Sequence, residues 1–436
     1  MPDTIFAIAS GSGVSGIAVL RISGPLALKI LATLSRATPQ PRLATLARLR
    51  DPATGEPLDH ALVLAFPGPR SFTGEDYAEI HLHGSRAVTG RALSILGAMA
   101  GCRPADPGEF TLRAFRNGKM DLTGVEGLGD LLAAETEAQR KQALRLMDGA
   151  LGRQADLWRA QVLQAQALIE AWIDFSEEED VPQAAIDQVT GLARGLIASM
   201  QEQLRLGAGG EIIREGFHVV IAGPPNVGKS SLLNAIARRD VAIVSPHAGT
   251  TRDLIEVRLD LGGIPVVLTD TAGVRQSADE IEGEGIRRGL KAAARADLVL
   301  WLFEAGGDPG SPAGVAGQRI DVATKSDLGG SDARASLSIC ATTGAGVPAL
   351  LEAITAQAGR RLAGAEGALL SRERHMRGIR DTVAALAPVA VASAATPLEL
   401  VAEDLRSAAT ALARIVGRID VEDVLGAIFE RFCIGK

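Results

Sequence analysis

The chain has 436 residues, more than one hydrophobic core usually organises, so more than one domain is expected. Hydrophobic residues make up 47% and charged residues 22%, an ordinary globular composition, while aromatic residues are so few, 3%, that the cores must be aliphatic. The formal charge of -7 excludes a whole-chain attraction to nucleic acid, so any RNA contact would need a local basic patch.

The chain carries no pattern of a secretion signal or of a membrane span. Its first residues, MPDTIFAIASGSG, have no basic region before an apolar stretch. The longest uncharged stretch, residues 382–398, contains proline and falls short of the ~20 strongly apolar residues that a span needs. Three scattered cysteines, Cys102, Cys340 and Cys433, fit a reducing compartment without a disulfide framework. The sequence therefore predicts a cytoplasmic protein.

The first part of the chain, to about Met120, alternates short β-like runs with turn clusters. The runs are IAVLRIS at 17–23, HALVLAF at 60–66 and YAEIHLH at 77–83, and FPGPRSFTGED at 66–76 is a turn cluster. This mixture predicts a sheet-rich α+β domain.

After Lys119 the apolar residues recur at helical spacing. The pattern runs with hardly a Gly or Pro break over 125–175, is interrupted by the acidic run SEEED at 176–180, and resumes over 184–206. Long helices are therefore expected after the sheet domain. The glycine-rich segment GAGGE at 207–211 is predicted to be a linker.

From Phe217 the pattern changes to strand, glycine-rich loop, helix and strand. The short aliphatic runs HVVIAG, PVVLTD, LVLWLF and IDVAT suit a parallel sheet that is buried on both faces. This α/β unit is expected to end near Ala358, and helical spacing resumes from Leu369. Helices on both sides predict that the unit is inserted into a helical domain, and four domains in series are the alternative.

The segment GPPNVGKS, from Gly223 to Ser230, matches the phosphate-binding pattern G-x-x-x-x-G-K-[ST] between a strand and a helix. Gly223 and Gly228 let successive backbone N–H groups and the helix N-terminus face phosphate oxygens. Lys229 supplies a cation to the β- and γ-phosphates, and the Ser230 hydroxyl is a predicted Mg²⁺ ligand. A glycine-rich turn with an incidental lysine is the alternative.

Two downstream motifs, AGTTRD at 248–253 and DTAG at 270–273, have the spacing of GTPase switch elements. The Thr251 hydroxyl is predicted to complete the Mg²⁺ shell and the Gly273 N–H to sense the γ-phosphate, so hydrolysis removes both contacts. Each residue alone could instead be a helix cap or a turn residue. Val274, which follows DTAG, has no polar group to orient water, so a glutamine-based mechanism is excluded.

Base recognition departs from the usual pattern. Where GTPases usually carry Asn-Lys-x-Asp, this chain has TKSD at 324–327, and CAT at 340–342 stands where a Ser-Ala motif is usual. The Asp327 carboxylate can accept from the guanine N1–H and exocyclic amine, so GTP is predicted over ATP. The predicted GTP-binding residues are Asn226, Val227, Gly228, Lys229, Ser230, Ser231, Ser245, Pro246, His247, Ala248, Gly249, Thr250, Thr251, Asp270, Thr271, Ala272, Gly273, Thr324, Lys325, Asp327, Cys340, Ala341 and Thr342.

Together these motifs resemble the family of tRNA modification GTPases MnmE, also called TrmE. The likeness covers nearly the whole chain and includes DTIFAIAS, LRISG, SFTGEDYAEIHLHG, RPADPGEFTLRAFRNGKMDLTGVEGLGDL, IDFSEEE, GPPNVGKSSLLNA, AGTTRD, DTAGVR and the terminal FCIGK. The resemblance implies a multidomain α+β and α/β fold. Its parts would be a folate-binding, aminomethyltransferase-like dimerisation domain over 1–119, helical segments over 120–213 and 361–436, and an inserted Ras-like P-loop GTPase domain over 214–360.

A folate site is implied by the same resemblance. Arg21, Glu79, Lys119 and Lys436 match the family's contacts to 5-formyltetrahydrofolate. Basic groups suit the glutamate tail of a folate, and a carboxylate suits the N–H edge of the pterin. Without the resemblance, each would be interpreted as a surface charge.

The resemblance further implies activation by K⁺. Asn226 matches the family's potassium ligand, helped by oxygens from Ser245, His247 and Thr250. A monovalent cation among the phosphates can take over the charge stabilisation that an arginine finger provides elsewhere. Glu282 matches the glutamate that orients the attacking water once two G domains meet.

The implied function is that of a homodimer that works with the flavoprotein MnmG on the wobble uridine, position 34, of certain tRNAs. The folate would donate one carbon to a C5 aminomethyl-type group, and GTP hydrolysis would open and close the G domains. Cys433 is a candidate nucleophile toward the uridine, or a small packing group. Two other functions stay open: a GTP-switched assembly factor without covalent chemistry, and a folate-dependent aminomethyltransferase regulated by a G domain.

Overall fold

A computed structural model describes residues 3–11, 13–175, 183–243, 256–270, 296–308, 318–330, 332–419, 422–429, 432, 434 and 435. These residues form two compact units. The first unit contains Met1–Gly129, Met147–Leu157 and Leu412–Lys436, and the second contains Asp130–Leu146 and Trp158–Ala411. Each unit is described by itself.

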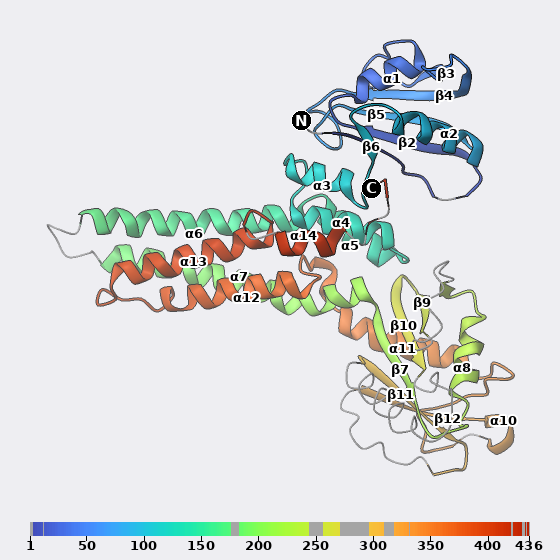
Figure 1. Cartoon of the computed structure of the whole chain (residues 1–436). Helices are drawn as coiled ribbons and strands as arrows, with labels where there is room; N and C mark the ends of the chain where they lie inside the picture. The colour runs from blue at the N-terminus through green and yellow to red at the C-terminus, as the bar shows by residue number, and fades with distance from the viewer. Residues whose placement is uncertain are drawn as a thin grey trace, which may run out of the picture. The chain divides into compact units, whose positions relative to one another are not determined.

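The first unit contains a six-stranded sheet with the strand order β3-β4-β5-β2-β1-β6. Helices α1 (Ala27–Ser35) and α2 (Arg86–Gly97) pack on one sheet face (Figure 1) and bury its apolar residues. The opposite face carries a smaller apolar cluster that includes Tyr77, together with polar residues. Side chains alternate between the faces of a strand, so Ala78, Ile80 and Leu82 of β5 enter this core while Glu79 points to the other face. The strands are β1 (Thr4–Ile8), β2 (Ser15–Ser23), β3 (Thr45–Arg50), β4 (Pro57–Phe66), β5 (Tyr77–Gly84) and β6 (Cys102–Pro104).

The last residues of the chain pack beside the N-terminal sheet domain. Helix α14 (Glu422–Phe429) contributes Leu425 and Phe429 to a core that also holds Phe432 and residues of α4 (Leu122–Ala133). Ile434 forms an antiparallel bridge with Pro107, just before α3 (Glu109–Arg116). The two ends of the chain therefore belong to one packed unit.

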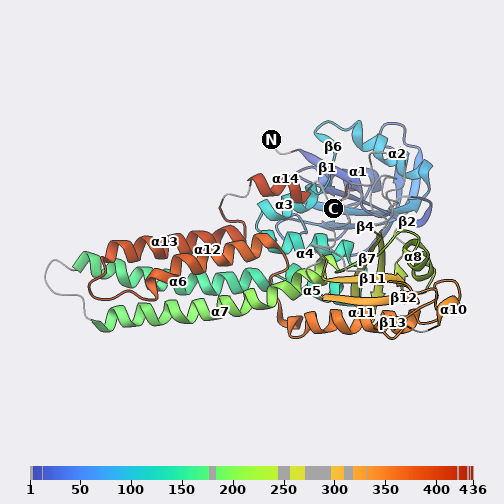
Figure 2. The same ribbon diagram turned by 90° about the horizontal axis from the view of Figure 1, so that it is seen from below.

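Long helices lie side by side in the second unit (Figures 1 and 2). Helix α7 packs along α12, and Arg194 Nε of α7 donates to the Ala390 carbonyl oxygen at 2.9 Å. The helical segments before and after the α/β domain are thus neighbours, as the sequence predicts. Their bounds are α5 (Glu137–Met147), α6 (Ala150–Phe175), α7 (Gln183–Glu215), η1 (Ala365–Gly367), α12 (Glu373–Val389) and α13 (Leu398–Ile415).

The linker predicted for GAGGE is wrong, because 207–211 lies inside α7. Glycine permits close packing here rather than a break. A Cβ on Gly209 would lie 2.3 Å from the Ala365 Cβ, and one on Gly210 would lie 2.1 Å from the Leu370 carbonyl oxygen. Helix α7 runs unbroken to Glu215, and β7 starts two residues later.

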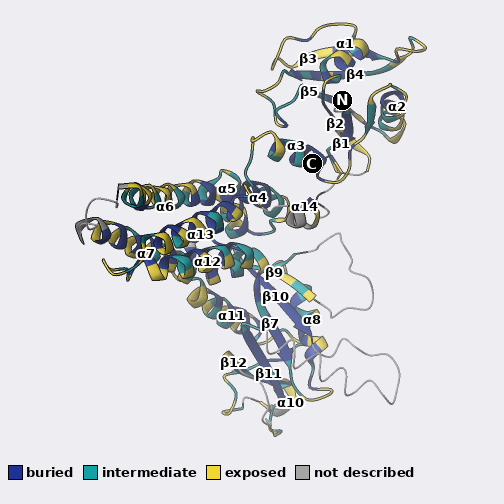
Figure 3. Ribbon diagram, turned by 60° about the vertical axis from the view of Figure 1, so that its left-hand side comes forward, coloured by how far each residue is buried: buried dark blue, intermediate teal, exposed yellow. Residues whose placement is uncertain are grey.

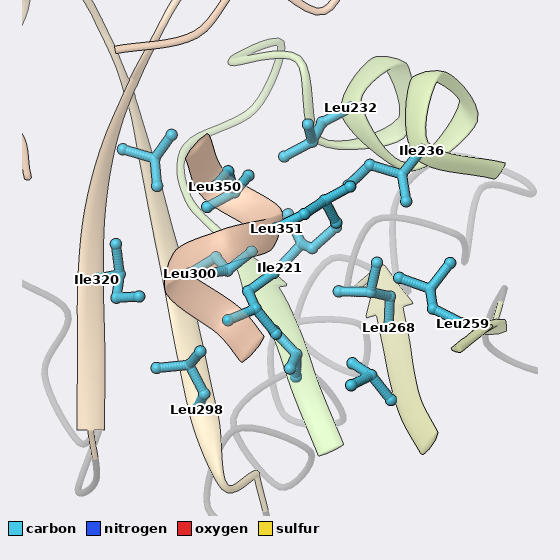
Figure 4. Packing of buried hydrophobic residues seen from close by; sticks show 14 of the residues in the cluster. Ile221, Leu232, Ile236, Leu259, Leu268, Leu298, Leu300, Ile320, Leu350 and Leu351 are labelled. Atoms are coloured by element: carbon cyan, nitrogen blue, oxygen red, sulfur yellow. The ribbon is translucent and has the colours of Figure 1, made fainter. Parts of the chain in front are cut away.

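The α/β domain is built on a seven-stranded sheet with the order β13-β12-β11-β7-β10-β9-β8. The strands predicted from the four aliphatic runs, β7, β10, β11 and β12, pair in parallel, and both β7 and β10 are largely buried (Figure 3). Leucine and isoleucine side chains from the sheet, α8 and α11 fill the core (Figure 4). The elements are β7 (Phe217–Ala222), α8 (Lys229–Ala237), β8 (Ala242–Ile243), β9 (Glu256–Leu261), β10 (Ile264–Asp270), β11 (Leu298–Glu304), β12 (Gln318–Thr324), α10 (Ser326–Gly329), β13 (Leu337–Ser338) and α11 (Val347–Leu362).

The fold class predicted from the sequence is confirmed: an α+β domain, long helices and a P-loop-bearing α/β domain are all present. The predicted domain bounds stay a prediction. Among the described helices, none is long and apolar enough to cross a membrane.

Candidate functional site

The glycine-rich loop joins the end of β7 to the start of α8. Gly223 has φ 149°, and a Cβ there would lie 2.3 Å from the Leu302 carbonyl oxygen, so the close approach to β11 requires glycine. Gly228 caps α8 in the left-handed region at φ 101°. Asn226 adopts φ 62°, a conformation that asparagine tolerates better than most residues. The loop therefore turns back over the N-terminus of α8, where backbone N–H groups can bind an anion.

Lys229 and Ser230 stand at the first turn of α8. The buried Lys229 ammonium donates to the carbonyl oxygens of Gly223 and Pro224, each at 2.8 Å. The Ser230 hydroxyl donates to Oδ2 of Asp270 at 2.7 Å, and Asp270 is fully buried at the end of β10. A hydroxyl and a carboxylate are thus brought together beside a lysine that spans the loop. Hard oxygen ligands of this kind suit Mg²⁺.

The segment predicted to read the base follows β12. Thr324 is buried, and its hydroxyl lies 2.7 Å from the Val227 carbonyl oxygen of the P-loop and 3.2 Å from the Phe303 carbonyl oxygen. Lys325 adopts φ 55° and places its ammonium 3.2 Å from Oε2 of Glu304. Asp327 is exposed in α10.

The second predicted base-reading motif lies next to the first. The Ser326 N–H donates to the Ile339 carbonyl oxygen at 3.2 Å, and the Cys340 N–H donates to Ala345 at 2.9 Å. The Cys340 side chain is buried and the Cys340 carbonyl oxygen accepts from the Gly344 N–H at 2.9 Å, which leaves the backbone of 341–342 to face a ligand. The structure thus brings the P-loop and both base-reading segments together at one end of the sheet.

Part of the predicted nucleotide and potassium site lies outside the described residues. Of the GTP-binding and potassium predictions, Asn226 through Ser231, Asp270 and the base-reading residues are described. The predicted residues beyond the described ranges are Ser245, Pro246, His247, Ala248, Gly249, Thr250, Thr251, Thr271, Ala272, Gly273, Glu282, Cys433 and Lys436. Their assigned roles remain predictions.

A second polar site lies on the face of the first sheet that α1 and α2 leave uncovered. Arg21 of β2 and Glu79 of β5 are directly paired across the strands, and Arg21 Nε lies 3.3 Å from Glu79 Oε1. The Arg21 guanidinium is 5.9 Å from the centre of the Phe72 ring and donates from Nη1 to the Gly435 carbonyl oxygen at 3.3 Å. Two of the residues predicted to bind folate are therefore in contact.

The other residues predicted to bind folate are less closely connected. Lys119 is exposed, and its ammonium donates to the Pro69 carbonyl oxygen at 2.9 Å, within the turn cluster that also carries Phe72. The contact between Arg21 and Gly435 brings the chain to the position just before Lys436. The polar sheet face, the turn cluster and the end of the chain thus meet in the first unit.

Two residues of this face were missed from the sequence. Tyr77 donates its hydroxyl to Glu79 Oε1 at 3.1 Å, and His81 Nε2 lies 3.6 Å from Glu79 Oε2. The signal was available, because alternate residues of one strand share a face and residues 77, 79 and 81 differ by two.

Together the strand, glycine-rich loop, helix and buried carboxylate define a P-loop nucleotide-binding protein. Residues 4–119 match the family model described as "GTP-binding protein TrmE N-terminus", and residues 122–433 match the one described as "MnmE helical domain". The chain belongs to the MnmE family of tRNA modification GTPases.

Relatives named "tRNA modification GTPase MnmE" match along the whole chain. The one from Beijerinckia indica is 53% identical over 435 residues, which cover 100% of this chain and 96% of the relative. The one from Methylobacterium sp. strain 4-46 is 51% identical and covers 100% of both. A solved structure of Aquifex aeolicus Era bound to GDP and AlF4⁻ is 25% identical over 32% of this chain and 56% of that chain, with a TM-score of 0.26, too low to support a conclusion.

Proposed function

We propose that this protein hydrolyses GTP in the modification of the wobble uridine of certain tRNAs, with a folate as the one-carbon donor and MnmG as partner. The observation that carries the proposal is the pairing, in one chain, of a P-loop with Lys229, Ser230 and Asp270 in place and a separate sheet face with Arg21 against Glu79. Full-length relatives that carry the name tRNA modification GTPase support it.

The P-loop residues have a direct role in this proposal. Lys229 would exchange its two carbonyl contacts for the β- and γ-phosphate oxygens of GTP, because a charged acceptor makes a stronger hydrogen bond than a neutral one. Ser230 and Asp270 would hold Mg²⁺, directly or through water, and the bound metal would neutralise charge on the phosphates. Asp327 would select guanine, as the sequence predicts.

Potassium activation is part of the proposal because Asn226 lies in the P-loop with an exposed side chain and a left-handed backbone. An amide oxygen suits K⁺, whose charge would supplement Lys229 at the phosphates. The remaining ligands predicted, Ser245, His247 and Thr250, lie outside the described residues. Hydrolysis with equal rates in Na⁺ and K⁺ buffers would reject this part of the proposal alone.

The folate assignment is supported by the chemistry of the polar face. Glu79 offers carboxylate oxygens to the N–H edge of a pterin, with the Arg21 guanidinium beside it, while the exposed Lys119 offers a donor to a carboxylate of the glutamate tail. GTP hydrolysis supplies no carbon, so its proposed task is to move the G domains of a homodimer and order the shared active site.

A lysine substitution tests the GTPase part of the proposal. In Lys229→Ala, GTP hydrolysis should fall at least 100-fold, since loss of a phosphate clamp costs on the order of 3 kcal/mol. Lys141→Ala is the matched control, because Lys141 is a surface residue paired with Glu137, and it should keep wild-type turnover.

The tRNA part is tested in a strain whose own gene is deleted. Mass spectrometry of tRNA nucleosides should show the wobble modification restored by the wild-type chain and lost with Lys229→Ala. If the modification persists in the deletion strain although the purified protein hydrolyses GTP normally, a GTP-switched assembly factor becomes the better description. If the purified protein turns over folate without tRNA or MnmG, a folate-dependent aminomethyltransferase regulated by a G domain becomes the better description.

A further inference from the structure

The Glu79 carboxylate is held on one oxygen by two groups of the same sheet face. The Tyr77 hydroxyl donates to Oε1 at 3.1 Å, and Arg21 Nε lies 3.3 Å from the same oxygen. The other oxygen, Oε2, lies 3.6 Å from His81 Nε2, beyond the usual length of a hydrogen bond. The two oxygens of Glu79 are therefore not equivalent.

Tyr77 is fixed more firmly than the groups around it. Its side chain is 2% exposed, and its ring packs against Phe66 at 5.8 Å and edge-on against Phe110 at 6.3 Å between centroids. Burial raises the pKa of the Tyr77 hydroxyl above its ordinary value, so at neutral pH the hydroxyl keeps its proton and donates. A rigid donor of this kind can set the rotamer of the carboxylate it binds.

We propose that Tyr77 is the positioning residue of the folate site: its hydroxyl binds Oε1 of Glu79 and thereby presents Oε2 to an N–H donor of the pterin. The inference rests on the proposed folate binding and adds a residue to it. Tyr77 takes an acceptor position of Oε1 by a hydrogen bond, and Arg21 Nε, which makes no hydrogen bond, adds only its charge near the same oxygen. The pterin ring N–H or exocyclic amine then meets a preoriented acceptor.

The test is the binding of 5-formyltetrahydrofolate to the full chain, by equilibrium dialysis with labelled ligand so that weak binding can also be measured. Tyr77→Phe keeps the buried ring and removes only the hydroxyl, and it should weaken binding about tenfold, the cost of one hydrogen bond to a charged group. Thr89→Val is the control, because it also removes one hydroxyl that donates a hydrogen bond, here to the Ser85 carbonyl oxygen at the start of α2, away from Glu79, and it should change affinity less than twofold.

A double-mutant cycle separates positioning from mere structural support. If Tyr77 acts through Glu79, then Tyr77→Phe should cost less than twofold in a Glu79→Ala background, which has no acceptor for the tyrosine hydroxyl, although it costs about tenfold in the wild type. Equal tenfold losses in both backgrounds, equal losses in Tyr77→Phe and Thr89→Val, or no loss in Tyr77→Phe would each overturn the role of Tyr77. A wild-type chain that binds no folate would instead remove the proposed folate function, on which this inference depends.

Discussion

Thr324 stands where GTPases usually carry an asparagine, and the structure gives this single side chain a specific task. Its buried hydroxyl joins the end of β12 to the Val227 carbonyl oxygen of the P-loop. A hydroxyl has one hydrogen to donate, so this contact uses the side chain's donor and leaves none for the base. Discrimination between bases is therefore expected to depend on Asp327 and on the backbone of 341–342.

Replacing Thr324 by valine removes the hydroxyl and keeps the shape. The Val227 carbonyl would then lose a buried donor, which typically costs about 1–2 kcal/mol; where this cost falls on the phosphate-binding conformation of the P-loop, GTP affinity should fall by up to roughly five- to thirtyfold. A filter-binding or fluorescence titration of GTP measures the change. Thr355→Val is the control, because Thr355 makes a similar contact to the Leu351 carbonyl within α11, and it should bind GTP like the wild type.

The lowered pKa of Glu109 predicts that the protein becomes less stable at acidic pH. Burial disfavours its charged form, but hydrogen bonds from Arg103, from the Asp106 N–H and from Arg113 outweigh burial and hold its pKa below the ordinary value. Because the folded pKa is depressed, the stabilisation is present above the unfolded pKa of about 4.3 and is lost as pH falls through the folded pKa.

The Glu109→Gln variant checks this dependence. At pH 7 it should be less stable than the wild type by about 1–2 kcal/mol, and the difference should shrink as the pH is lowered below about 4. Thermal unfolding at a series of pH values gives the comparison. A difference that stays constant across the series would contradict the assignment.

At the scale of elements, the sequence predicted most of the strands and helices. It failed where glycine could either end a helix or allow close packing inside one. The run YAEIHLH and the four aliphatic runs of the α/β domain became the expected strands, because hydrophobic periodicity is a local property. The linker predicted for GAGGE is wrong because its glycines allow close contact with residues 365 and 370. Those residues lie more than 150 positions later in the chain. The P-loop was predictable for the opposite reason, since the residues that define it all lie in one short segment between β7 and α8.

Two alanine substitutions in the same helix test that explanation. Gly210→Ala should destabilise the protein by about 2–3 kcal/mol, because the new Cβ would meet the Leu370 backbone oxygen at 2.1 Å. Gly195→Ala has nothing within 4 Å of its Cβ and should be neutral or stabilising by up to about 1 kcal/mol, as expected from helix propensity. The thermal midpoints of the two variants are compared with that of the wild type, and a stable Gly210→Ala variant would show that the segment before α12, which carries Leu370, can shift.

At the scale of the whole molecule, residues from the two ends of the sequence contact each other at the polar sheet face. Gly435 accepts a hydrogen bond from Arg21, and at φ 94° a Cβ there would lie 2.5 Å from the Ile8 carbonyl oxygen. No propensity rule links positions 21 and 435, so local sequence patterns could not have predicted the contact. Only the family resemblance connected the ends.

Gly435→Ala should therefore displace the end of the chain from the polar sheet face. Folate binding is expected to weaken about tenfold or more and the tail to become sensitive to protease, while GTP hydrolysis by the isolated protein stays within twofold. The control is Gly426→Ala in α14, where nothing lies within 4 Å of the added Cβ. Equal folate affinity in both variants would mean that the tail has no part in the site.

The length of helix α7 determines how far a small tilt at one end moves the other end. Its 33 residues make a rod of about 50 Å, and a single glycine separates its last residue, Glu215, from the strand that ends at the P-loop. The close contacts of Gly209 and Gly210 hold the base of that rod against its neighbours. A tilt of about 5° at the base would therefore move the far tip by roughly 4 Å, a displacement as large as a side chain.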